Sequence, residues 1–166
     1  FDAFIDLGSL DIIPDEKSAR EGVPSNPSKS VLWQDILIGL FDRQVEGWNL
    51  PKHFSGYEEK LKEAFCNAPD GLKSIFETPS ILAAVLAAKA ELGIKLKKAY
   101  DSKNMDELNN LADLELPALK SNVLKLRDSH RAQWLKTYKP FGWEVIDIRY
   151  GGLVARIETA IYRIKQ

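Results

Sequence analysis

The sequence has a single cysteine, Cys66, so no disulfide can form within the chain. Only two histidines are present, His53 and His130, and they lie far apart in the sequence. Metal sites need clustered His, Cys and carboxylate ligands, and nucleotide sites need glycine-rich loops such as GxxxxGK[ST] or GxGxxG. Neither pattern occurs, nor does the GxSxG motif of a nucleophilic serine. We therefore expect no metal and no cofactor.

Long apolar runs and an excess of charge of one sign are also missing. No stretch approaches the roughly 20 apolar residues that cross a bilayer, and no signal-peptide pattern is present. The 23 basic and 24 acidic residues nearly cancel, which argues against nucleic acid or a membrane surface as a partner. With 45% hydrophobic residues, the composition is that of an ordinary globular protein, which we expect to be cytoplasmic.

Helical periodicity dominates what is there. Prolines 14, 24 and 27 predict a loop over 14–30 after a short apolar helix end at 1–7. Long helices are predicted over 51–67, 70–102, 104–138 and 141–166, with a restart at Thr78-Pro79 and a kink or split at Pro117. Asn104 is expected to cap its helix. The sequence thus predicts an all-α fold, an antiparallel bundle of about four long helices. We expect an irregular linker segment over 1–42 and the bundle over 43–166, together forming one unit.

The last predicted helix is apolar on two sides. Its core line holds Ile146, Tyr150, Leu153, Ile157, Ala160, Ile161 and Ile164. A second line holds Val145, Ile148, Gly152, Ala155, Thr159 and Tyr162, and Arg149, Arg156 and Arg163 follow the edge between the two lines. Such a helix is either central in the domain or shared with a partner.

Glycine costs about 1 kcal/mol inside a helix relative to alanine, so Gly151 and Gly152 call for an explanation. We expect Gly152 to mark the close approach of another backbone, with Arg149 and Arg156 paired to its neighbours. His130 lies on the apolar line of its helix and is expected to be a core histidine. Cys66 is expected to be a small buried residue near a helix end.

The stretch HRAQWLKTYKPFGWEVIDIRYGGLVARIETA (130–160) resembles the C-terminal helical domain of a subgroup of glycoside hydrolase family 20, the bacterial-type exo-β-N-acetylhexosaminidases. The matching positions are His130, Trp134, Lys139, Pro140, Phe141, Gly142, Glu144, Asp147, Arg149, Gly151, Gly152, Ala155, Arg156 and Glu158. A second stretch, NPSKSVLWQDILIGLFD (26–42), resembles the segment that joins the barrel to this domain, and FDAFIDL (1–7) resembles the end of the catalytic module.

The resemblance implies a parent (β/α)8-barrel enzyme that removes terminal N-acetylglucosamine or N-acetylgalactosamine. In that enzyme a Glu is the acid, and an adjacent Asp orients the substrate acetamido group, which is the nucleophile. The two Asp-Glu dipeptides of this chain, at 15–16 and 106–107, lie outside the matching motifs. The chain itself is then expected to be a catalytically inactive piece of a longer protein.

The implied role is architectural: the domain packs on the catalytic barrel and supports a homodimer, and amino-sugar glycans are reached through the parent enzyme. Residues of such a domain can also lie near the active-site mouth. The candidates for substrate binding or for an interface are Trp143, Asp147, Arg149, Tyr150, Gly152 and Arg156 from one motif, and Lys29, Trp33 and Asp35 from the other. Sugar stacking is one interpretation of Trp33 and Trp143; a core or interface position is the other, and the one that we favour.

Two further functions stay open at this point. A stand-alone helical interaction module would fit the all-α pattern and the balanced charge. An independent carbohydrate-binding module would need exposed aromatic side chains along a groove, and the chain has four tryptophans, Trp33, Trp48, Trp134 and Trp143.

Overall fold

A computed structural model describes residues 2–12, 26–45 and 47–166. Within these ranges the chain is helical and contains no strand, which confirms the all-α fold. The helices are α1 (Asp2–Ser9), α2 (Pro27–Trp33), α3 (Asp42–Val45), α4 (Leu50–Asn67), α5 (Asp70–Lys89), α6 (Leu92–Asp101), α7 (Met105–Asn110), α8 (Leu116–Thr137) and α9 (Trp143–Ile164). A π-helical turn, η2 (Leu111–Glu115), joins α7 to α8.

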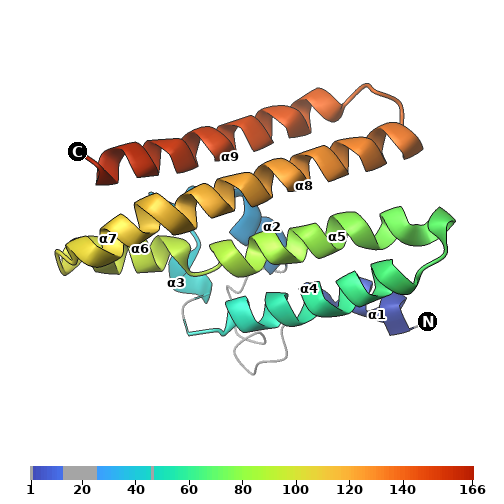
Figure 1. Cartoon of the computed structure of the whole chain (residues 1–166), viewed down its shortest axis with the longest axis horizontal. Helices are drawn as coiled ribbons and strands as arrows, with labels where there is room; N and C mark the ends of the chain where they lie inside the picture. The colour runs from blue at the N-terminus through green and yellow to red at the C-terminus, as the bar shows by residue number, and fades with distance from the viewer. Residues whose placement is uncertain (1, 13–25, 46) are drawn as a thin grey trace.

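Two antiparallel hairpins form the bundle, as Figure 1 shows. Helix α4 packs against α5, α5 packs against α8, and α8 packs against α9, so that α9 is an outer helix. Helix α1 lies on α4, and α2 lies against α5 on the far side of the view. Buried side chains of α2, α4, α5, α6, α8 and α9 form one continuous hydrophobic core.

Local signals place most helix starts correctly. The side chain of Asn104 accepts a hydrogen bond from the backbone N–H of Glu107, as expected of an N-cap residue. Asn49 caps α4 in the same way through the N–H of Lys52, and Asn26 caps α2 through the N–H of Lys29. These capping residues lie within three residues of the groups that they cap, so the sequence alone indicates them.

The predicted restart at Thr78-Pro79 is wrong. Helix α5 runs through Pro79 without a break, and the Thr78 hydroxyl lies 2.8 Å from the Ser129 hydroxyl of α8 instead of capping a new helix. The interruption comes at Ala90–Glu91, where α5 ends and α6 begins. The packing of α5 against α8 thus determines the partner of the Thr78 hydroxyl, and the local sequence pattern does not reveal that packing.

Pro117 does not split its helix. The backbone N–H of Leu116 bonds to the carbonyl of Leu111, five residues earlier, in the π-helical turn that precedes the proline. A widened turn is a known way to accommodate a disruption within a helix. Helices α7 and α8 therefore continue one another, as Figure 1 shows.

The predicted loop over 14–30 is wrong at its end, because residues 27–30 form the first turn of α2 with Pro27 at the first helical position. The greater part of this loop, with the Asp15-Glu16 dipeptide, lies outside the described residues. In the described part, the Asp11 carboxylate accepts hydrogen bonds from the N–H of Ser28 at 2.8 Å and from its hydroxyl at 3.0 Å. This contact joins the region after α1 to the start of α2.

Candidate functional site

The two sequence motifs meet where the C-terminal end of α2 lies beside α9. The Arg156 Nε donates a hydrogen bond to the carboxylate of Asp35, 121 residues away in the sequence. The guanidinium of Arg149 lies over the ring of Trp33, 5.8 Å from its centroid, and Tyr150 contacts the same ring edge-on at 5.1 Å. We call these five residues, Trp33, Asp35, Arg149, Tyr150 and Arg156, the motif junction.

The turn after α2 holds Asp35 in place. One carboxylate oxygen of Asp35 accepts a hydrogen bond from the N–H of Leu37 at 2.8 Å, and the other accepts from Arg156. The side-chain carbonyl of Gln34, which is buried, accepts a hydrogen bond from the N–H of Phe41 at 3.2 Å. The segment that follows α2 is therefore fixed by its own side chains before it reaches α9.

Lys89 secures the same segment from the opposite side. Its side chain is 1% exposed, and its Nζ donates to the backbone carbonyls of Val31 at 2.6 Å, Leu32 at 2.9 Å and Gln34 at 2.6 Å. An ammonium group at these carbonyls satisfies the C-terminal end of α2, whose carbonyls have no partner within the helix. Burial lowers the pKa of Lys89 to about 7, against the opposing charges of Asp35 and Asp42.

Lys89 is a residue of this region that the sequence analysis does not select, although it lies among buried aliphatic positions of α5. A lysine among buried aliphatic positions is itself a signal, because a buried amine needs a partner. The identity of that partner depends on tertiary structure.

A second set of contacts extends from Tyr150 into the α8–α9 hairpin. The Tyr150 hydroxyl lies 3.2 Å from Nδ1 of His130, and the His130 ring contacts Trp143 edge-on at 5.3 Å. Tyr150 is 2% exposed and Trp143 is 9% exposed, so neither offers a ring face to a sugar on this chain. Burial raises the pKa of Tyr150 well above its usual value and lowers that of His130. These groups are neutral near pH 7 and hold the hairpin together.

Asp147 lies on another side of α9. Its carboxylate accepts hydrogen bonds from Nε of Arg127 at 2.6 Å and from Nη2 at 3.3 Å, which joins α9 to α8. The hydrogen bond from Arg127 lowers the pKa of Asp147. Asp147 is therefore not part of the motif junction. Lys29 is exposed on the first turn of α2.

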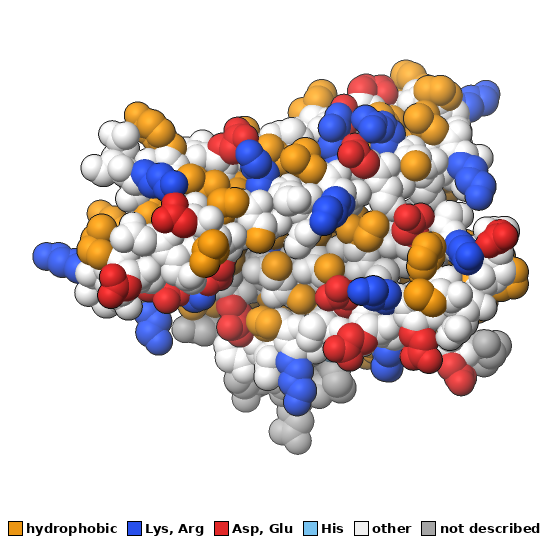
Figure 2. Space-filling model, viewed as in Figure 1, with side chains coloured by type: hydrophobic (Ala, Val, Ile, Leu, Met, Phe, Trp, Pro, Cys, Tyr) orange, Lys and Arg blue, Asp and Glu red, His pale blue; other side chains and the backbone are white. Residues whose placement is uncertain are grey.

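The second apolar line of α9 is largely exposed. Val145 is 57% exposed, Ile148 74% and Tyr162 65%, and Gly152 and Ala155 are exposed between them. We call these five residues the outer α9 line. The core line of the same helix is buried at Tyr150, Leu153, Ile157 and Ala160. Figure 2 shows hydrophobic side chains beside Lys and Arg along the upper edge of the molecule, over α9.

No close approach to Gly152 occurs within the described chain, since a Cβ placed there meets nothing within 4 Å. The same holds for Gly151. The close approach occurs at Gly93 instead, where a Cβ would lie 3.1 Å from the carbonyl oxygen of Ile36 and 3.0 Å from the Asp42 carboxylate. The close approach expected at Gly152 is therefore not made by the described residues.

The expectation for Cys66 is wrong. It lies near the end of α4, as predicted, but it is exposed. His130, expected in the core, is half-buried between Tyr150, Trp143 and Trp134.

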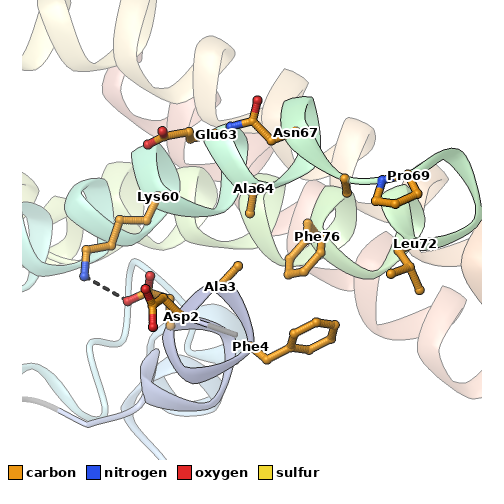
Figure 3. A pocket seen from close by; sticks show the side chains of 12 residues that line it. Asp2, Ala3, Phe4, Lys60, Glu63, Ala64, Asn67, Pro69, Leu72 and Phe76 are labelled. Carbon is orange, nitrogen blue, oxygen red and sulfur yellow. Dashed lines mark hydrogen bonds and ion pairs between the residues drawn. The ribbon is translucent and has the colours of Figure 1, made fainter.

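A separate groove of about 500 Å3 lies between α1 and the α4–α5 hairpin (Figure 3). Phe4 contacts Phe76 edge-on at 5.3 Å, and Lys60 forms an ion pair of 2.8 Å with Asp6, drawn as a dashed line. Helix α1 contains no buried residue, and Phe4 is 48% exposed. None of the candidate residues from the two motifs lines this groove.

Within the described ranges, no group of three or more His, Cys, Asp or Glu side chains could hold a metal ion. Across the same part of the chain, every helix is too short or too polar to span a membrane.

The comparisons with known proteins identify the family. The model of the Glycoside Hydrolase 20C C-terminal domain matches residues 2–166. The chain belongs to this family. A search of curated proteins finds no match. Because the family model spans nearly the whole chain, it favours an accessory domain of a glycoside hydrolase over a stand-alone interaction module. As a C-terminal domain, the chain is expected beside a catalytic domain.

Proposed function

We propose that the chain is the non-catalytic C-terminal domain of an exo-β-N-acetylhexosaminidase, that it packs on the catalytic barrel, and that it supports a homodimer. The observation that carries this proposal is the outer α9 line. Val145, Ile148 and Tyr162 are each more than half exposed on one helix, and hydrophobic side chains gathered on one exposed helix face are typical of a surface that a partner covers.

The motif junction supports the same function. Arg156 and Arg149 are anchored by Asp35 and Trp33, beside the outer α9 line, so this corner of the domain is rigid before any partner arrives. Rigid side chains lose little entropy on binding. We infer that Trp33, Asp35, Arg149 and Arg156 shape the corner that faces the barrel, with Lys29 exposed beside them.

Gly152 supports the docking part of the proposal. It lies exposed within the outer α9 line, with open space above it. A helix surface without a side chain at this point lets a neighbouring backbone come close. We propose that the part of the outer α9 line that the barrel leaves uncovered contacts a second copy of the protein.

The described Asp-Glu dipeptide supports the absence of catalysis. Asp106 and Glu107 lie on the first turn of α7, and the Glu107 carboxylate forms an ion pair of 2.8 Å with Lys95. The purified chain is expected not to hydrolyse a nitrophenyl N-acetylglucosaminide, and turnover by the chain would contradict the proposal.

Docking is tested with the purified catalytic module of the same enzyme. Sedimentation velocity should show a complex with the chain, and Ile148→Asp should abolish it. Tyr100→Asp is the matched control, because Tyr100 is 73% exposed and lies on α6, which packs mainly against α5 and α7. Equal binding by the two variants would exclude the outer α9 line as the docking surface. The size of the whole enzyme, measured with and without Ile148→Asp, tests the homodimer.

A further inference from the structure

An aromatic hollow of about 440 Å3 opens at the C-terminal end of α8. His130, Gln133, Trp134 and Tyr138 line it. Gln133 and Trp134 follow His130 by three and four residues, and Tyr138, directly after α8, follows Trp134 by four, so the four side chains lie on one side of the helix end. The hollow shares no residue with the motif junction or with the outer α9 line, and it touches the junction only where His130 contacts Tyr150.

The two large rings of the hollow lie against each other. The rings of Trp134 and Tyr138 lie 4.9 Å apart at 41°. The Trp134 Nε1 donates to the carbonyl of Lys139 at 2.9 Å, and the backbone N–H of Tyr138 donates to the carbonyl of Trp134 at 2.7 Å. The Trp134 ring is therefore held by its own hydrogen bond, and the Tyr138 ring lies against it at the edge of the hollow.

Polar groups accompany the rings. His130 uses Nδ1 for its contact with Tyr150, and among the described residues neither its Nε2 nor the Gln133 side-chain amide has a hydrogen-bond partner. Burial lowers the pKa of His130, so the imidazole is neutral at pH 7. No lining side chain carries a charge at that pH, which disfavours phosphate, nucleotide and acidic ligands.

We propose that this hollow binds a pyranose ring of a glycan. The sugar ring lies against Trp134 and Tyr138, and its hydroxyl groups bond to the Gln133 amide and to His130. An apolar face bordered by a few neutral hydrogen-bonding groups matches a pyranose, whose C–H face is apolar and whose rim is polar. The volume is within the range of about 300–1,000 Å3 that small-ligand sites occupy.

The proposal rests on the proposed function for its choice of sugar, an N-acetylglucosamine unit. The site would then bind a sugar unit of the glycan other than the one that the catalytic module removes, as an auxiliary contact. Such an open site of four side chains is expected to bind weakly, with a Kd of about 1 mM.

The test is an NMR titration of the isotope-labelled chain with N,N′-diacetylchitobiose, up to about 20 mM. Saturable shifts are expected at the Gln133 side-chain amide and the Trp134 indole N–H. Tyr138→Ala should weaken binding about fivefold or more, because it removes one ring from the site. The matched control is Tyr100→Ala: Tyr138 is 66% exposed and Tyr100 73%, and Tyr100 lies on α6, outside the hollow and outside the outer α9 line.

Three outcomes would overturn the proposal: no saturable shift, equal weakening by both variants, or shifts caused by a proline-rich peptide but not by the sugar. Circular dichroism of each variant checks that its helices are intact. The titration uses the chain alone, whereas the docking test uses the catalytic module. A failure of sugar binding is therefore distinct from a failure of the proposed accessory role.

Discussion

The Nζ of Lys89, on α5, donates a hydrogen bond of 2.6 Å to the carbonyl oxygen of Val31, on α2, across 58 residues of sequence. With its bonds to Leu32 and Gln34, this single side chain satisfies the carbonyls at the end of α2. Trp33 and Asp35, which contact α9, lie in the same segment. Lys89 therefore links the helical core to the motif junction.

Lys89→Met should lower the free energy of unfolding by about 2–4 kcal/mol, because three buried carbonyls lose their donor while the apolar stem is kept. Urea unfolding measures the change. Lys98→Met, on the exposed face of α6, is the control and should change the stability by less than about 0.5 kcal/mol. If the free energy of unfolding of Lys89→Met equalled that of the wild type, these hydrogen bonds would contribute nothing to stability.

The stability that depends on Lys89 should increase with pH above 7. The pKa of Lys89 is about 7 in the folded chain, and the ordinary value for lysine, 10.5, applies in the unfolded chain. The unfolded chain therefore binds more protons than the folded chain between pH 7 and 10.5. The free energy of unfolding then rises with pH, by up to about 1.4 kcal/mol per unit. The difference between the wild type and Lys89→Met isolates this effect; a difference that stays constant from pH 7 to 9 would contradict it.

Local features of the fold were predictable, and long-range ones were not. Asn104 as a cap and the buried line of α9 follow from spacing within a few turns. The resemblance selected Asp35 and Arg156 as separate candidates, but nothing in the sequence indicated that they bond to each other. Their contact depends on how α2 lies beside α9, and the three partners of Lys89 depend on the same packing.

The ion pair between Asp35 and Arg156 should contribute measurably to stability. In a double-mutant cycle with Asp35→Asn and Arg156→Ala, we expect a coupling energy of about 0.5–1 kcal/mol, since the side chains are 20% and 40% exposed. Asn keeps an acceptor for the Leu37 N–H, so the turn is retained. The control pair, Lys97 and Asp101, is 74% and 57% exposed and should couple more weakly. Equal coupling in the two pairs would show that burial of the junction adds nothing.

Cys66 should react with a thiol reagent in the folded chain without prior unfolding, because its side chain is exposed. It is the only cysteine, so the absorbance of the released reagent group reports on this site alone. The rate in native buffer is expected to be within about tenfold of the rate in denaturant. Protection by several orders of magnitude would instead support the buried position that the sequence suggested.

Two glycines should respond to alanine in opposite ways. Gly152→Ala places a methyl group in open space and removes the entropic cost of a helical glycine, so it should stabilise the chain by up to about 1 kcal/mol. Gly93→Ala should destabilise it by about 1–3 kcal/mol, because the methyl group would meet the Ile36 carbonyl at 3.1 Å. Thermal unfolding of both variants decides the matter. If Gly152→Ala instead destabilised the isolated chain, a contact within the chain would have to cover Gly152. Gly152 could then not lie at the proposed docking surface.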